Sequence, residues 1–311
     1  MEDSPLISVL LPTYNVEQYV EQAINSILYQ TYSNLELIVV DDCSSDRTFD
    51  YVLRIAQHDS RVRAFRNERN LKISRTLNFA LSCASGDLIA RMDGDDISHP
   101  KRLEKLQQFL LSHPDIDLVG SLSEAIDENG KHLAFRKLPL TPRWIHRTLP
   151  LCSTVQHIWL AKRELYEELG GYRECPGAED YDFLLRADSH GHRLANYPEY
   201  LYQVRLRRGN TESSEGLNRV LTKQYVYRAN RNGFNIDLPT LQASIKIGDK
   251  QKDKYRKASN RLNKAKHERD KPLKMIADTL LAAFTSVHMT RYLIEVTLVR
   301  LACKVEVNDE I

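Results

Sequence analysis

Three carboxylates surround one glycine in the stretch Asp93-Gly94-Asp95-Asp96. Carboxylates supply the hard oxygen ligands that Mg²⁺ and Mn²⁺ prefer. Asp93 and Asp95 are separated by a single residue and could turn toward one point, where a metal ion would bridge to a substrate diphosphate. A plainer interpretation is a turn with negative charge in front of the helix that Pro100 starts, because helix N-termini favour acids.

These carboxylates directly follow an apolar run at residues 88–92, which predicts a buried strand. Similar runs at 6–11, 35–40 and 61–65 alternate with helical patterns, and this alternation predicts an α/β fold with a parallel sheet. Asn15 is expected to cap the first helix. Neither G-x-G-x-x-G after the first strand nor G-x-x-x-x-G-K-[ST] occurs, so phosphates bound at this sheet would need a metal.

Polar motifs end three of the predicted strands: Pro12-Thr13-Tyr14-Asn15, Asp41-Asp42 and Asp93-Gly94-Asp95-Asp96. The carboxyl ends of parallel strands meet at one edge of a sheet, where α/β proteins bind their ligands. The three motifs together therefore predict one pocket.

In this order the motifs resemble those of the family-2 inverting glycosyltransferases of GT-A fold. Further along, Gly170-Gly171-Tyr172-Arg173 and Ala178-Glu179-Asp180-Tyr181-Asp182 resemble the acceptor-side signature of that family, and the likeness covers residues 6–210. It implies a Rossmann-like, mostly parallel sheet flanked by helices. We expect this catalytic domain at residues 1–230 and a basic, amphipathic helical extension at residues 231–311.

The resemblance implies a metal-dependent hexosyltransferase that takes a sugar from a nucleotide-sugar donor, expected to be UDP-linked, with Mn²⁺ or Mg²⁺ as cofactor. The implied metal ligands are Asp95 and Asp93. The implied donor-binding residues are Pro12, Tyr14, Asp42, Asn78, Asp93 and Arg207, and the implied acceptor-side residues are His157 and Glu179. Arg207 stands where many relatives carry a histidine, so a fixed cation beside the diphosphate replaces a metal ligand in this prediction.

Asp180 is the implied catalytic base. An inverting transfer is a direct displacement at the anomeric carbon, and Asp180 would take the proton of the attacking acceptor hydroxyl. The same residues also fit plainer roles: Asp180 as negative charge at a helix start, Asp42 as a helix cap and His157 as a structural histidine in an apolar segment.

Residues 246–274 form a basic run of twelve Lys and Arg against four acids. The run carries +8, so the rest of this chain of net charge +2 carries −6. An apolar helical pattern follows, and this combination fits docking on an anionic membrane surface. Membrane contact would suit a lipid-linked glycan acceptor, such as one on undecaprenyl diphosphate, in O-antigen, capsule or exopolysaccharide synthesis. The alternative is an extension that packs on the catalytic domain with its basic face in solvent.

The composition is that of a globular protein, with 311 residues, 42% hydrophobic and 28% charged. Its five cysteines are scattered and lack a C-x-x-C pair, which argues against a zinc site and a disulfide framework. The first residues do not resemble a signal peptide, and no run of 18 apolar residues occurs. We therefore expect a cytoplasmic protein, peripheral on the inner face of the plasma membrane.

Two other functions fit parts of the sequence. A sugar-nucleotide pyrophosphorylase also uses an α/β domain and a metal-binding Asp, but it normally carries a Gly-rich loop where this chain has Pro12-Thr13-Tyr14-Asn15. The basic run could instead bind an anionic polymer without catalysis. We expect no nucleic acid partner, because the run lacks interleaved aromatic residues beyond Tyr255.

Overall fold

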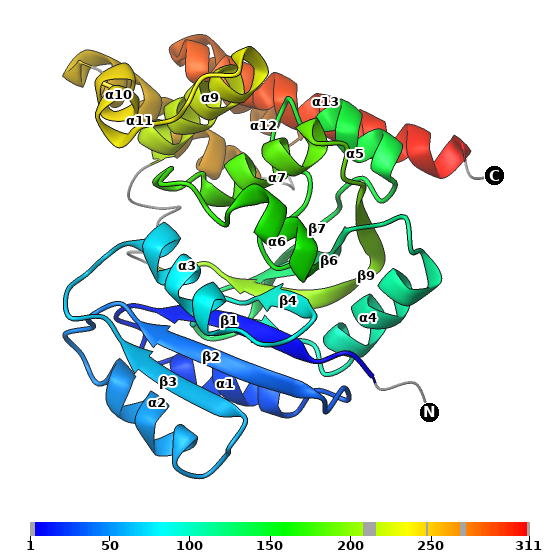
Figure 1. Cartoon of the computed structure of the whole chain (residues 1–311). Helices are drawn as coiled ribbons and strands as arrows, with labels where there is room; N and C mark the ends of the chain where they lie inside the picture. Colours follow the sequence, from blue (N-terminus) through cyan, green and yellow to red (C-terminus); the bar gives the residue numbers. More distant parts are fainter. Residues whose placement is uncertain (1–3, 208–215, 247, 268–271, 310–311) are drawn as a thin grey trace.

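The computed structural model describes residues 4–207, 216–246, 248–267 and 272–309 (Figure 1). The strands are β1 (Ile7–Thr13), β2 (Leu35–Asp41), β3 (Val62–Arg66), β4 (Leu88–Arg91), β5 (Ile97–Ser98), β6 (Leu118–Ile126), β7 (His132–Arg136), β8 (Leu160–Lys162) and β9 (Leu194–Arg205). The helices are α1 (Val20–Leu28), α2 (Thr48–Ala56), α3 (Ile73–Cys83), α4 (Arg102–Ser112), α5 (Pro142–Thr148), α6 (Arg163–Leu169), α7 (Glu179–Ser189), α9 (Gly216–Asn232), α10 (Leu238–Ser244), α11 (Asp249–His267), α12 (Pro272–Thr285) and α13 (Val287–Asp309).

The strands of the described residues form one sheet in the order β3-β2-β1-β4-β8-β6-β9-β5, with β7 paired to β6. The first four strands of this order run parallel, with Ile7 opposite both Leu35 and Leu88. This confirms the parallel sheet that the sequence predicted. Strand β8 is antiparallel to both of its neighbours, whereas β6 and β9 are parallel, so the complete sheet is mixed.

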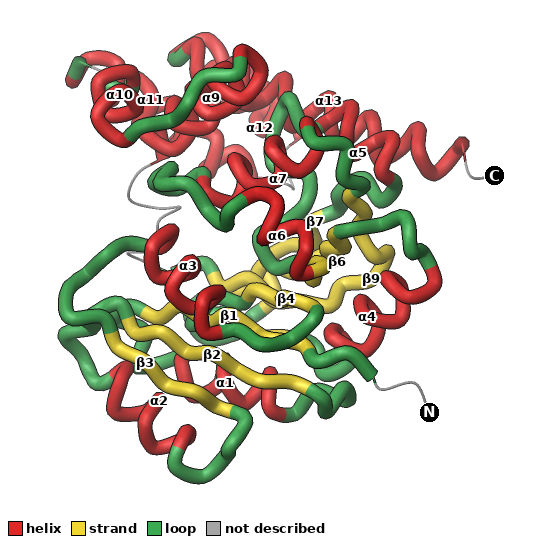
Figure 2. Tube along the Cα trace, in the orientation of Figure 1, coloured by secondary structure: helices red, strands yellow, loops and turns green. Residues whose placement is uncertain are grey.

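Helices cover both faces of the sheet, because side chains alternate along each strand. In β1, Ile7, Val9 and Leu11 join the core under α1 and α4, whereas Leu10 joins the core under α3, α6 and α7. Figure 2 shows the sheet between these two helical layers. The result is a layered α/β arrangement, in which helices on both faces of the sheet fix the strand ends in place.

Helices α9 to α13 lie together on the side of the molecule that carries α5 and α7 (Figure 1). Helix α9 packs on α7, and α13 packs on α5. The buried carboxylate of Glu306 in α13 accepts hydrogen bonds from the backbone N–H groups of Leu140 and Thr141, and from the Thr141 hydroxyl at 2.6 Å. Because Thr141 is the N-cap of α5, Glu306 ties the end of the chain to the start of that helix. No helix in the described part is both long and apolar enough to cross a membrane.

Candidate active site

The loops after β1 and β2 are tied to each other at the expected sheet edge. The backbone N–H of Asn15 donates to the Ser44 hydroxyl at 2.9 Å, and that of Ser45 donates to Oδ1 of Asn15 at 2.9 Å. The prediction that Asn15 caps the first helix is wrong, because α1 begins at Val20. Asn15 has a φ of 50° instead. Asn accepts this left-handed conformation more readily than most residues.

Asp42 is buried under the loop that follows β3. Its carboxylate accepts hydrogen bonds from the backbone N–H groups of Leu71 at 2.7 Å and Lys72 at 2.9 Å, and from the Asn67 amide at 2.8 Å. Asp42 therefore holds the loop that leads into α3, and it does not cap α2 as the plainer interpretation had it. Tyr14 lies at the rim, with 47% of its surface exposed, and Pro12 is buried inside β1. Their roles toward a donor stay predictions.

Gly94 brings the carboxylate turn against the end of β1. A Cβ atom at this position would lie 2.9 Å from Cγ2 of Thr13 and 3.3 Å from the carbonyl oxygen of Pro12. Separations this short are not tolerated between carbon atoms in a packed core. The glycine therefore serves the packing of this turn on the neighbouring strand.

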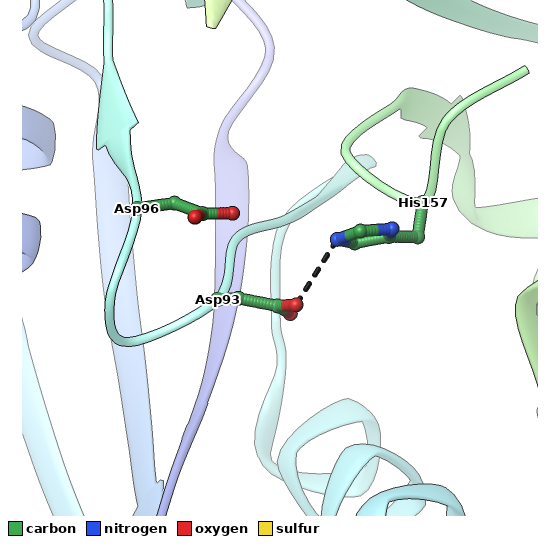
Figure 3. A group of neighbouring side chains, drawn as sticks. All are labelled: Asp93, Asp96 and His157. Atoms are coloured by element: carbon green, nitrogen blue, oxygen red, sulfur yellow. Dashed lines mark ion pairs between the residues drawn. The ribbon is translucent and has the colours of Figure 1, made fainter. Parts of the chain in front are cut away.

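Asp93, Asp96 and His157 form the cluster that could hold a metal ion (Figure 3). One ligand atom from each residue lies within 4.8 Å of the others. Asp93 is held by the Tyr202 hydroxyl, which accepts from the Asp93 backbone N–H, and Asp96 accepts a hydrogen bond from the Arg205 N–H. Strand β9 thus holds the backbone of Asp93 and the carboxylate of Asp96.

The charges of this cluster fit a divalent cation. His157 Nε2 lies 3.0 Å from Oδ2 of Asp93, yet this buried nitrogen makes no hydrogen bond within the described part of the chain. Burial and the negative charges of Asp95 and Asp93 raise the pKa of Asp96 well above its usual range. A cation would relieve this repulsion, and two carboxylates with one imidazole are a donor set suited to Mn²⁺.

Asp95, which was predicted as a metal ligand, lies outside the cluster of Asp93, Asp96 and His157. Its Oδ2 pairs with Nε of Arg207 at 2.7 Å, and the cluster described above contains Asp96 in its stead. Arg207 therefore lies beside the carboxylate turn, as expected for a cation near a diphosphate. The metal role of Asp95 and the donor role of Arg207 stay predictions.

Arg91 is a site residue that the sequence analysis missed. Its guanidinium is buried, and one nitrogen, NH2, contacts both Asp93 at 3.4 Å and Glu179 at 3.2 Å. The remaining nitrogens, Nε and NH1, have no partner among the described residues. The available signal was a charged residue within an apolar strand directly before an acid cluster, since buried charges are kept only where they are paired.

Glu179 and Asp180 start α7 and are both buried. Burial raises the pKa of Glu179, and Arg91 only partly opposes this effect. Burial also raises the pKa of Asp180, but nearby positive charge, led by that of Lys223, outweighs it and holds the pKa below its usual range. This direction favours the ionised carboxylate, the form that a base requires. Lys223 of α9 was not singled out by any sequence pattern.

Asn78 joins helix α3 to the loop before α7. Its amide donates to the Tyr172 carbonyl at 2.8 Å and accepts from the Tyr172 N–H at 2.8 Å. A Cβ atom at Gly171 would lie 2.6 Å from Oδ1 of Asn78, and the φ of Gly171 is +74°, so only glycine fits there. The structure gives Asn78 this joining role, and its predicted donor contact stays a prediction.

The fold and the gathered carboxylates define a GT-A glycosyltransferase. Residues 8–170 match the model of the family described as "Glycosyl transferase family 2". The chain belongs to this family. An uncharacterized glycosyltransferase of Haemophilus influenzae is 33% identical over 253 residues, covering 76% of this chain and 78% of that protein. The family decides for a transferase over the pyrophosphorylase that part of the sequence also fitted.

Two further relatives are also named as glycosyltransferases, and the name of one refers to O-antigen biosynthesis. "Putative glycosyltransferase EpsE" of Bacillus subtilis is 39% identical, with 66% of this chain and 74% of that protein covered. "O-antigen biosynthesis glycosyltransferase WbnJ" of Escherichia coli is 33% identical, with 67% and 83% covered.

Solved structures share the fold at low sequence identity. TarS of S. aureus in complex with UDP-GlcNAc is similar with a TM-score of 0.59 and 21% identity, covering 77% of this chain and 70% of that one. The mannosyltransferase PcManGT of Pyrobaculum calidifontis, in complex with GDP-Man and Mn²⁺, is similar with a TM-score of 0.58 and 20% identity, covering 98% and 87%. These likenesses establish the GT-A architecture.

Proposed function

We propose that this enzyme transfers a sugar from a nucleotide-sugar donor, UDP-linked, to a hydroxyl of a glycan acceptor with inversion at the anomeric carbon. The observation that carries the proposal is the position of Arg91. Its NH2 group contacts Asp93 of the metal-type cluster and Glu179 of α7, so the two halves of the site lie side by side. Structural neighbours with UDP-GlcNAc and GDP-Man support a nucleotide-sugar donor.

Asp93, Asp96 and His157 would hold the metal, with Asp95 as the alternative carboxylate. When bound there, a divalent cation supplies charge neutralisation to the nucleoside diphosphate. Arg207 adds a fixed positive charge beside the same turn. Asp42 and Tyr14 would bind the nucleobase of the donor at the edge of the sheet where β1 and β2 end.

Asp180 would act as the base on the acceptor side. As the acceptor oxygen forms its bond to the anomeric carbon, its proton passes to the carboxylate of Asp180, and the bond to the donor diphosphate breaks on the opposite face. Lys223 keeps Asp180 ionised before this step. His157 and Glu179 would line the acceptor side of the reacting carbon.

We further propose that the acceptor is a lipid-linked glycan of a surface polysaccharide and that transfer takes place at the inner face of the membrane. The name of WbnJ supports O-antigen synthesis as the process. The basic C-terminal extension supports an anionic surface as partner.

The test is a binding and transfer assay over UDP-, GDP- and dTDP-sugars with Mn²⁺, Mg²⁺ or EDTA. We expect one donor to bind only with metal, Asp93→Asn to abolish that binding, and Asp180→Asn to bind the donor while transfer falls by about 10²–10⁴-fold. Comparing Asp95→Ala with Asp96→Asn tells which carboxylate completes the metal site. Asp115→Asn, an exposed carboxylate outside the site, is the matched control and should behave as wild type.

Two results would overturn this proposal. If no nucleotide sugar binds with either metal, the proposed donor site is contradicted. If Asp180→Asn transfers the sugar at the wild-type rate, the assignment of Asp180 as the catalytic base is contradicted. An NMR assignment of the product linkage tests inversion directly, since retention of the donor's anomeric configuration contradicts direct displacement.

A further inference from the structure

The outer faces of α12 and α13 carry an unusual number of exposed apolar side chains. They recur at helical spacing in both helices, so each helix presents one continuous apolar stripe. The members of this apolar surface are Ile276, Leu280, Leu281, Phe284, Val287, Ile294, Leu298, Leu301 and Val305. Phe284 is 86% exposed and Val287 is 74% exposed, so the junction of the two helices is its most prominent part.

This surface is not the one by which α13 is attached. A neighbouring face of α13 holds the buried side chains of Val299, Ala302 and Glu306. Glu306 binds the backbone before α5. The helix is therefore fixed to the catalytic domain by one face while a second apolar face stays in water. Contiguous exposed apolar surface of this kind marks an interaction site in soluble proteins.

A stripe of cations runs beside the apolar surface. Lys250, Lys254, Lys257, Arg261 and Lys264 are all exposed and follow the 3.6-residue period along one face of α11. NH1 of Arg261 donates to the Thr285 hydroxyl at 3.0 Å. Since Thr285 is the neighbour of Phe284, this bond places the stripe next to the most exposed apolar side chain.

Positive charge predominates over the whole of this region. Among the described residues from 249 to 306, the only exposed acid is Asp249. The exposed cations of the same range are Lys250, Lys252, Lys254, Arg256, Lys257, Arg261, Lys264, Lys274, Arg291, Arg300 and Lys304. Apolar stripes flanked by this excess of cations match the boundary between lipid tails and anionic head groups.

We propose that the α12–α13 surface inserts into the head-group region of an anionic bilayer, with the α11 stripe on the lipid phosphates. The charge pattern favours lipid over a second copy of the chain, because a copy would offer the same cations and few acids. It favours lipid over a nucleic acid, because phosphates would leave Phe284 and Val287 in water. Glu306 fixes the docked surface relative to the active site. The proposal rests on the proposed function only for the lipid-linked acceptor.

A hollow of about 590 Å³ lies where this surface meets the catalytic domain. Its lining includes Phe284, Val287 and Ile294 of the apolar surface, and Leu151 of the catalytic domain. The segment of Leu151 continues to His157 at the active site. The docked surface is therefore connected to the acceptor side of the site by a short stretch of chain.

The test is co-sedimentation of the full chain with vesicles of phosphatidylcholine alone or mixed with an equal part of phosphatidylglycerol. Binding is expected only with phosphatidylglycerol and is expected to weaken with salt. The variant F284D/V287D should lose about 100-fold in partitioning, because each buried apolar side chain contributes about tenfold or more. Lys254, Lys257 and Lys264 changed together to Gln should also lose about 100-fold, at about fivefold each. Leu111→Asp, on α4 and 66% exposed, is the matched control and should bind as wild type.

Three outcomes would overturn the docking proposal. In the first, wild type and F284D/V287D partition equally onto vesicles. In the second, wild type is a dimer that does not bind vesicles, and F284D/V287D is a monomer. In the third, the chain binds RNA and F284D/V287D binds it equally well. Donor turnover without vesicles separates the two proposals. Vesicle binding with no turnover contradicts only the proposed function, and turnover with no vesicle binding contradicts only the docking surface. Unchanged turnover by F284D/V287D confirms that the variant is folded.

Discussion

Glu306 offers the sharpest test of how the C-terminal helices are attached. Changing Glu306 to Ala removes the acceptor of three donors, which are the N–H of Leu140 and the N–H and hydroxyl of Thr141. A hydrogen bond to a charged group contributes about 1.5–3 kcal/mol, but the two donor residues, Leu140 and Thr141, are only partly buried. Water therefore recovers part of the loss.

A net cost of about 3 kcal/mol follows for the three donors together. This corresponds to an increase of about 150-fold in the opening equilibrium of α13. Glu306→Gln keeps one acceptor oxygen in the same shape, so it should cost about 1 kcal/mol. Hydrogen exchange of the α13 amides measures the opening, and urea unfolding measures the global change.

Lys304→Ala is the control for Glu306, since Lys304 is exposed on the same helix turn and should stay within about 0.5 kcal/mol of wild type. If α13 exchanges equally fast in wild type and Glu306→Ala, the carboxylate does not hold the helix. The attachment would then depend on the apolar contacts of α13 alone.

Two further predictions concern charged groups of the sheet. Arg91→Met leaves Asp93 and Glu179 without their shared cation, so the unfolding free energy should fall by about 3–5 kcal/mol. Combining Arg91→Met with Glu179→Gln should recover part of this loss in urea unfolding. If the double variant recovers nothing, the pairing of Arg91 with Glu179 is refuted. Burial raises the pKa of Glu36, but hydrogen bonds led by Ser8 outweigh it and lower the pKa from 4.5 to about 2. Because the folded pKa is depressed, the stability that Glu36 provides is complete above pH 4.5 and is lost as the pH falls toward 2. Acid unfolding of Glu36→Gln should show a shallower loss over that interval, and curves of equal slope would contradict this.

The first four strands were predictable from sequence because each is an apolar run bounded by polar residues, and the predicted bounds lie within one or two residues of β1 to β4. The arrangement of the carboxylates was not. Spacing suggests that Asp93 and Asp95 turn to one point, but the turn is set by its packing on Thr13 and by Arg207, 112 residues further on. The same holds for Glu306, whose partners lie 165 and 166 residues away. Contacts over such separations leave no local periodicity to read.

The C-terminal extension agrees in part with each of the two sequence-based alternatives. Its helix α13 packs on the catalytic domain through Glu306, as one alternative required. Its outer face still exposes an apolar stripe beside a basic helix, as the other required. Sequence reasoning treated the two as exclusive because it assigned one apolar face to α13, whereas this helix is apolar on more than one side.

The amide of Asn78 restricts which sequences can be combined in a chimera of this enzyme. Its paired hydrogen bonds to Tyr172 span the boundary between the part that would choose the donor and the part that would choose the acceptor. A chimera that joins the first half of this chain to the second half of a relative must keep Asn78 opposite a glycine and an unobstructed backbone. Exchange of acceptor specificity through such chimeras is therefore constrained by the contact between the Asn78 amide and the Tyr172 backbone.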